Sequence, residues 1–153
     1  MTSLCCDVLK ALEGKTLATA ESCTGGMIGA MLTSVSGASK VYKGGIISYW
    51  SEVKQNLLNV DGEDLKNLGP VSMQVAGAMA QGARKALNTD IAISVTGLAG
   101  PDGDEFGRPV GTVFVGFDNG AKTVVKVYHF SGDREAVRRQ AAEAALKLIL
   151  EYA

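Results

Sequence analysis

The segment Ile91-Ala-Ile-Ser-Val-Thr96 limits the possible folds more than any other part of the sequence. It is short and rich in β-branched residues, and it is apolar on both faces of the strand that it predicts. A strand of this kind lies in the interior of a sheet that has helices packed on both sides. The sequence therefore predicts an α/β protein with this strand near the centre of its sheet.

The pattern on either side of this strand alternates between helical and extended periodicity. Two capping signals are clear, since Ser51 and Asp133 each precede a segment with helical spacing, and Asn119-Gly120 is a strong hairpin signal. The order of elements predicts a three-layer α/β/α sandwich with a mixed, mostly parallel sheet of about five strands. The predicted helices cover residues 4–12, 25–34, a short segment capped by Ser51, 72–87 and 134–152, and the other predicted strands cover 16–21, 44–50, 111–117 and 122–130.

Length and composition favour one globular domain that spans residues 1–153. The 15 Lys and Arg are offset by 16 Asp and Glu and form no long run, so we expect no nucleic-acid partner. We also expect no membrane partner, because no apolar window approaches the roughly 18 residues of a membrane span. An odd number of cysteines, two of them adjacent, argues against a disulfide framework, and no secretion signal is visible, so a cytoplasmic location is expected. The cysteines and His129 do not have zinc-ligand spacing, and we predict neither a metal nor a cofactor.

Candidate chemistry begins at Glu21-Ser-Cys-Thr-Gly-Gly26, between a predicted strand and a predicted helix. Backbone N–H groups at such a junction can hold an anion or a developing oxyanion, and the glycines let a ligand approach closely. Thr24, Gly25 and Gly26 are the candidate oxyanion and substrate-binding positions. Taken alone, the motif would be an ordinary helix cap followed by packing glycines.

Three further segments end at the same predicted edge of the sheet. Tyr49 and Lys54 follow one strand, and a surface charge would be the usual role of such a lysine. The glycine-rich segment 96–103 follows the central strand and matches neither a phosphate-binding loop nor a dinucleotide-binding motif. Its candidate substrate-binding residues are Thr96, Gly97, Ala99 and Gly100. Pro109-Val-Gly-Thr112 leads into the hairpin.

Together these four segments resemble the CinA C-terminal domain family, which includes stand-alone nicotinamide-nucleotide amidases. The resemblance covers nearly the whole chain and rests on segments 20–26, 44–49 with Lys54, 96–101 and 109–112. It implies hydrolysis of the carboxamide of nicotinamide mononucleotide to nicotinate mononucleotide and ammonia, with the family's serine, tyrosine and lysine at Ser22, Tyr49 and Lys54. On this resemblance Ser22 is the nucleophile and a neutral Lys54 is its base, while Tyr49 could relay the proton or hold the lysine in place. It also implies a small-molecule nucleotide as substrate and a dimer or larger homo-oligomer. The chain departs from the family pattern after Pro101, where acidic residues (Asp102, Asp104 and Glu105) replace glycines.

Two alternatives stay open at this point. Cys23 also lies at the start of a helix, where thiolates are stabilised, and would need His129, the single histidine, as its base. The chain could instead be a non-catalytic nucleotide-sensing or interaction module that keeps the pocket.

A phosphate could meet the arginines that begin the last helix, which are Arg134, Arg138 and Arg139, although a solvated helix face is an equal explanation.

Overall fold

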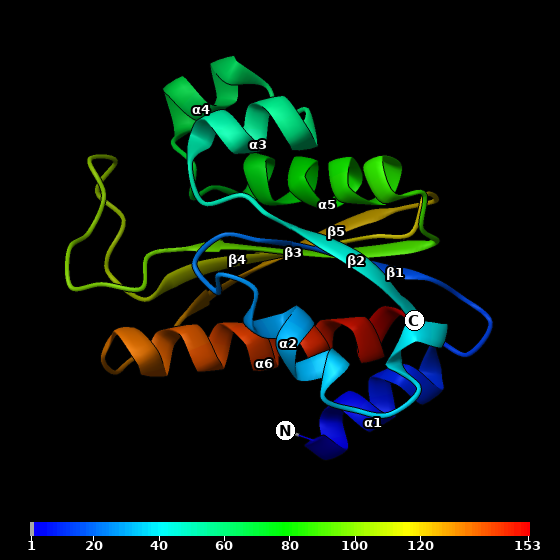
Figure 1. The fold of residues 1–153 in the computed structure, drawn as a ribbon. Coiled ribbons are helices and arrows are strands. Elements are labelled where there is room, and N and C mark those ends of the chain that lie inside the picture. The colour runs from blue at the N-terminus through cyan, green and yellow to red at the C-terminus, as the bar shows by residue number, and fades with distance from the viewer. Residues whose placement is uncertain (1) are drawn as a thin grey trace.

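Five strands form a single sheet in the computed structural model, which describes residues 2–153 (Figure 1). Across the sheet the strands are β2 (Tyr42–Ile47), β1 (Leu17–Glu21), β3 (Ile91–Gly97), β4 (Thr112–Asp118) and β5 (Thr123–His129). The central strand is β3, as predicted, and six of its seven residues are buried. β1 runs parallel to β2 and to β3, whereas β3–β4 and β4–β5 are antiparallel pairs, so four strands share one direction. The predicted mixed sheet is confirmed, with its pairings divided evenly between the two kinds.

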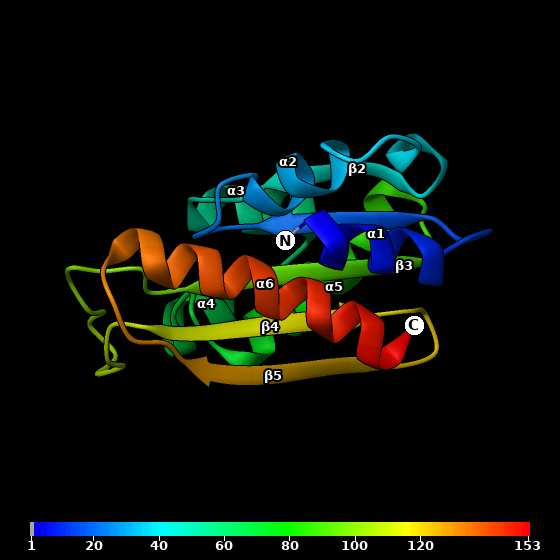
Figure 2. The ribbon, with the colours of Figure 1, turned by 90° about the horizontal axis from the view of Figure 1, so that it is seen from below.

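Helices cover both faces of the sheet and complete the predicted three-layer sandwich. In Figure 1, one layer of helices lies above the sheet and another lies below it, and Figure 2 shows the lower layer from beneath. The upper layer contains α3 (Ser51–Leu58), α4 (Gly62–Leu68) and α5 (Met73–Leu87), and the lower layer contains α1 (Thr2–Ala11), α2 (Met27–Thr33) and α6 (Arg134–Tyr152). None of the helices within residues 2–153 is both long enough and apolar enough to cross a membrane.

The two faces of the sheet carry side chains of different size. The face toward α5 is lined with alanines such as Ala18, Ala20 and Ala92, whereas larger residues such as Ile93 pack toward α6. Gly116 faces α5 without a side chain, because a Cβ there would lie 2.6 Å from the carbonyl oxygen of Ala76. The small residues therefore let the alanine-rich α5 lie close against the sheet.

A second close approach places α3 against α5. A Cβ at Gly82 of α5 would overlap the main-chain carbonyl of Leu58, the last residue of α3. Only glycine fits here, and the contact fixes the end of the helix that carries Lys54. The position of Lys54 therefore depends on packing in the upper layer as well as on its own sequence.

The predicted elements are all present, and α4 and a short 3-10 helix at Ala38–Lys40 are additional helices that were not predicted. The other differences lie at the ends of the elements. The second strand ends at Ile47 instead of residue 50, because the next carbonyls turn toward the Lys54 amine. Ser51 was expected to cap α3 but is its first residue, and the N-cap is Trp50, which makes no side-chain capping bond. Asp133 caps α6 as predicted and accepts the N–H of Ala136. Ser72, the predicted first residue of the long helix, is instead the N-cap of α5 and accepts the N–H of Val75.

The hairpin between β4 and β5 has a longer loop than its sequence suggests. Asp118 pairs with Thr123, so four residues form the connection instead of the two of a tight turn. The Asn119 side chain causes this, since its amide oxygen accepts the N–H groups of Ala121 and Lys122. An asparagine side chain can replace a backbone acceptor in this way and stabilise a wider loop.

Candidate active site

Ser22 lies in a tight turn directly after β1. Its N–H donates to the carbonyl of Val95 on β3 (3.0 Å), and its own carbonyl accepts the N–H of Gly25 (3.0 Å). Gly25 and Gly26 both have positive φ, at 60° and 104°, a conformation that glycine adopts without strain. The main chain of Ser22 is thereby fixed on both sides, and the residue is only 7 % exposed.

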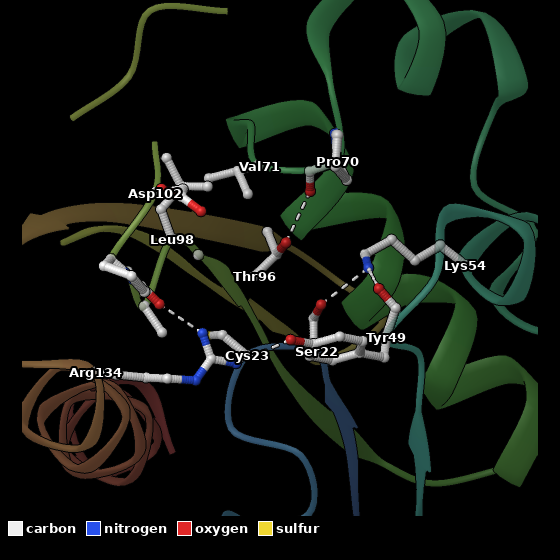
Figure 3. Close-up of a pocket in the computed structure, with 14 residues that line it drawn as sticks. Ser22, Cys23, Tyr49, Lys54, Pro70, Val71, Thr96, Leu98, Asp102 and Arg134 are labelled. Carbon is white, nitrogen blue, oxygen red and sulfur yellow. Dashed lines mark hydrogen bonds between the residues drawn. The ribbon is translucent and has the colours of Figure 1, made fainter. Parts of the chain in front are cut away.

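Lys54 reaches this turn from α3. Its side chain is 1 % exposed, and its Nζ lies 2.9 Å from the Oγ of Ser22 (Figure 3). The same nitrogen donates to the main-chain carbonyls of Ser48 (2.6 Å) and Tyr49 (3.2 Å). No carboxylate pairs with Lys54 among residues 2–153, so two carbonyls and one hydroxyl surround the amine.

This environment favours the neutral amine. Burial lowers the pKa of Lys54 from its ordinary 10.5 to about 8, because a charged ammonium loses its hydration there. A neutral amine has two N–H bonds and one lone pair. If the N–H bonds serve the carbonyls of Ser48 and Tyr49, the lone pair faces Ser22 and can accept its hydroxyl proton. The arrangement can thus activate a serine nucleophile.

The pair opens into a cavity of about 340 Å³. The facing wall is the segment after β3, because β1 and β3 are adjacent parallel strands whose ends lie together. Thr96, Gly97, Ala99 and Gly100 all line the cavity. The N–H groups of Ala99 and Gly100 have no acceptor within residues 2–153, so both are available to a ligand.

The start of α2 differs from the expectation of free N–H groups. The carboxylate of Glu21 accepts the N–H groups of Ile28 (2.9 Å) and Gly29 (3.0 Å) and the hydroxyl of Thr24 (2.7 Å). A buried carboxylate from the preceding strand therefore occupies the positions that an anionic ligand would use.

The structure also changes which backbone N–H group is the best candidate for the oxyanion hole. Thr24, Gly25 and Gly26 do not line the cavity, whereas Cys23 does. The N–H of Gly25 is already used by the Ser22 carbonyl, but the N–H of Cys23 has no oxygen acceptor among the described residues. Cys23, directly after Ser22, is therefore better placed as an oxyanion donor than the three residues that follow it.

Tyr49 lines the cavity, but its hydroxyl is not in a position to relay a proton between Ser22 and Lys54. Its hydroxyl accepts from Arg134 (3.0 Å), and no hydrogen bond within residues 2–153 joins that hydroxyl to Ser22 or Lys54. Arg134 also donates to the carbonyl of Gly100 (2.6 Å), so it connects both sides of the cavity mouth (Figure 3). The contact of Tyr49 with Lys54 is made by its main-chain carbonyl.

The cysteine alternative has little support in this geometry. Burial raises the pKa of the Cys23 thiol from 9.0 to about 11, so the thiol keeps its proton at neutral pH. His129 lies on β5, three strands from β1, which corresponds to roughly 14 Å at the usual strand spacing. Its imidazole Nδ1 is 3.4 Å from the hydroxyl of Thr112. Cys23 thus has neither the thiolate nor the base that this mechanism needs.

Of the three arginines considered for a phosphate, only Arg134 lines the cavity. Arg138 donates to the carbonyls of Cys23 and Thr24, and Arg139 pairs with Glu135 on the exposed side of α6. In the acidic loop, Asp102 faces the cavity, whereas Asp104 binds backbone N–H groups within its own loop. Among residues 2–153, no group of three His, Cys, Asp or Glu side chains lies close enough to hold a metal ion.

The fold and the site define a class: a three-layer α/β protein with a buried serine–lysine pair at the ends of adjacent parallel strands. The chain belongs to the CinA C-terminal domain family, whose model matches residues 2–153. A CinA-like protein of Syntrophomonas wolfei is 47 % identical over 139 residues, which are 91 % of this chain and 33 % of the relative. The chain spans about a third of the length of the curated relatives that it matches.

Solved structures show the same architecture over the whole chain. The competence damage-inducible protein A (ComA) of Klebsiella pneumoniae superposes with a TM-score of 0.96 at 37 % identity, covering 99 % of this chain and 95 % of that one. The competence/damage inducible protein CihA of Agrobacterium tumefaciens gives a TM-score of 0.94 at 31 % identity, covering 98 % and 93 %. The α/β fold is therefore that of the CinA family.

Proposed function

We propose that this chain is an amidohydrolase that converts nicotinamide mononucleotide to nicotinate mononucleotide and ammonia. The observation that carries the proposal is the contact between the buried Lys54 amine and the Ser22 hydroxyl, at 2.9 Å, in a cavity. A buried lysine with a lowered pKa and no acidic partner is costly to the fold and is typical of a catalytic base. The substrate follows from the family resemblance of the four motifs.

The reaction proceeds in two acyl-transfer steps. Lys54 takes the hydroxyl proton as the Ser22 oxygen attacks the carboxamide carbon, and the N–H of Cys23 faces the developing oxyanion. The Lys54 ammonium then gives its proton to the leaving nitrogen, the C–N bond breaks, and ammonia departs from an ester of Ser22. In the second step Lys54 accepts a proton from water as the hydroxide adds to the ester carbon. The bond between that carbon and the Ser22 oxygen then breaks, the Lys54 ammonium returns its proton to the Ser22 oxygen, and the acid leaves.

The remaining cavity residues suit a nucleotide of this kind. A volume of about 340 Å³ falls within the range of sites for small ligands. Arg134 supplies a positive charge at the mouth for the phosphate, and the N–H groups of Ala99 and Gly100 supply further donors. Asp102 supplies a negative charge on the same wall, suited to the cationic pyridinium ring.

The test is ammonia release from nicotinamide mononucleotide by the purified chain, with Ser22→Ala as the matched control. We expect ammonia and nicotinate mononucleotide in equal amounts from the wild type and none from the variant. Nicotinamide riboside, which lacks the phosphate, should react more slowly if Arg134 binds that group. Binding of the nucleotide without turnover would instead support a sensing module and overturn the proposed activity.

A further inference from the structure

The turn that carries Ser22 is held from outside the cavity by two charged side chains. Glu21 holds one side through the three hydrogen bonds described above, and its carboxylate is 2 % exposed. Arg138, from α6 in the lower layer, holds the other side. Neither residue lines the cavity, so neither is placed to touch a substrate there.

The hydrogen bonds that Arg138 makes within residues 2–153 go to the main chain of the turn. Its Nε donates to the carbonyl of Cys23 (2.9 Å), and its Nη2 donates to the carbonyl of Thr24 (3.2 Å). It takes part in none of the ion pairs formed within residues 2–153. The rigid fork of donors in a guanidinium suits two neighbouring carbonyls in a way that a lysine ammonium does not.

These two bonds set the direction of the peptide planes. In a trans peptide the C=O and N–H groups point in opposite directions. Holding the Cys23 and Thr24 carbonyls against α6 therefore directs the N–H groups of Thr24 and Gly25 away from it. The N–H of Gly25 then closes the turn on the Ser22 carbonyl.

We propose that Arg138 is a positioning residue that fixes the Ser22 turn, so that the Ser22 hydroxyl stays within reach of Lys54 and of the scissile carbonyl. The inference rests on the proposed function, since it assigns Arg138 a part in the same reaction. Displacement of a nucleophile by about 1 Å is enough to lower a rate about 10²-fold. Arg138 acts through the turn, whereas buried apolar side chains hold α6 in the fold.

Those side chains belong to the apolar residues of α6. Val137, Ala141, Ala145 and Ile149 are fully buried in the core below the sheet. The Arg138 side chain, by contrast, is only partly buried. Loss of its guanidinium should therefore affect catalysis far more than the free energy of unfolding.

The test compares Arg138→Met, which keeps the apolar stem, with Arg138→Lys and with Arg139→Met. Arg139 is the matched control, because it is the next residue of the same helix and its exposed side chain pairs only with Glu135. We expect Arg138→Met to lower kcat about 10²-fold with an almost unchanged KM. Arg138→Lys should fall between the two, and Arg139→Met should keep the wild-type kcat.

A second measurement separates this inference from the proposed substrate. A fluorophosphonate phosphonylates an activated serine: the Ser22 oxygen bonds to phosphorus, fluoride leaves, and Lys54 takes the proton. Intact-mass measurement of the labelling rate needs no nucleotide. We expect slow labelling of Arg138→Met, wild-type labelling of Arg139→Met, and thermal midpoints close to that of the wild type for both.

The labelling and ammonia measurements distinguish failure of the positioning role from failure of the proposed function. If Arg138→Met were labelled as fast as the wild type, the positioning role would be overturned while the proposed function stood. If the wild type were neither labelled nor released ammonia, both would be overturned. If Arg138→Met unfolded, Arg138→Lys would decide: a lower labelling rate with an unchanged thermal midpoint supports positioning, and equal losses of both show a structural role that overturns it.

Discussion

The Lys54 amine lies 2.9 Å from the Ser22 hydroxyl, although 32 residues separate the two in the chain. The parallel pair β1–β2 explains the contact, since Ser22 follows one strand and the segment leading to Lys54 follows the other. Parallel neighbours end at the same edge of a sheet, and the packing of α3 on α5 then turns the lysine inward.

The activity should depend on pH through Lys54. Burial lowers its pKa to about 8, and only the neutral amine can accept the Ser22 proton. The rate at low substrate concentration should therefore rise with pH, about tenfold for each pH unit well below 8, and level off above it. Ammonia release measured between about pH 6 and about pH 10 would check this. A flat profile across that interval would remove Lys54 as the base.

The two residues should behave as one catalytic unit. Ser22→Ala and Lys54→Ala should each abolish measurable ammonia release, and the double variant should be hardly worse than either single one, because residues of one unit are strongly non-additive. Nucleotide affinity, measured by calorimetry, should change little in Ser22→Ala. Losses that added up in the double variant would show that the two side chains act independently.

Cys23 should be dispensable as a thiol. Burial raises its pKa to about 11, and its contribution to the reaction is a backbone N–H that substitution leaves in place. Cys23→Ser should therefore keep most of the wild-type kcat. The opposite pattern, an inactive Cys23→Ser beside an active Ser22→Ala, would move the nucleophile one position along the chain.

The Tyr49 hydroxyl should help to hold Arg134 instead of moving a proton. The carbonyl of Tyr49 contacts Lys54, and Tyr49→Phe preserves that carbonyl while removing the hydroxyl that accepts from Arg134. We expect a raised KM for the nucleotide, a moderate loss of kcat, and no change in the midpoint of the pH profile. Complete inactivity of Tyr49→Phe with unchanged binding would restore the relay role.

The sequence predicts the fold well because each element carries a local signal. The two-sided apolar strand at Ile91 and the cap Asp133 are examples that the structure confirms. Errors occur where a side chain replaces a backbone partner, as Asn119 does in the hairpin loop. Whether a side chain accepts a backbone N–H in this way depends on its rotamer, which spacing along the chain does not determine.

The residues of the candidate site could be predicted only in part, since Thr24, Gly25 and Gly26 do not line the cavity. The motifs select Ser22 and Lys54, which the structure brings together. No pattern reveals that Glu21 occupies the helix start or that the Ser48 carbonyl accepts from Lys54. The first depends on how a strand end meets the next helix, and the second involves a main-chain atom that any residue would supply.

The buried Lys54 amine should weaken the fold at neutral pH, because burial penalises its charged form. The pKa of Lys54 is 10.5 when unfolded and about 8 when folded. Above 10.5 both states are neutral, and below 8 both carry a proton, which is then buried in the folded state. The unfolded chain binds more protons between these values, so the free energy of unfolding of the wild type rises with pH across that interval.

Lys54→Met removes this dependence while filling the same space. At neutral pH the variant should therefore be more stable than the wild type, by at most about 3 kcal/mol, the equivalent of the lowered pKa. The unpaired carbonyls of Ser48 and Tyr49 offset part of this gain. The advantage should shrink toward about pH 10, as the wild type loses its buried charge. Urea unfolding at both pH values would measure it, with the exposed Lys85→Met as control. The difference in unfolding free energy between Lys54→Met and the wild type could instead stay constant with pH. Lys54 would then have the same pKa in the folded and unfolded states, and burial would not make it a neutral base.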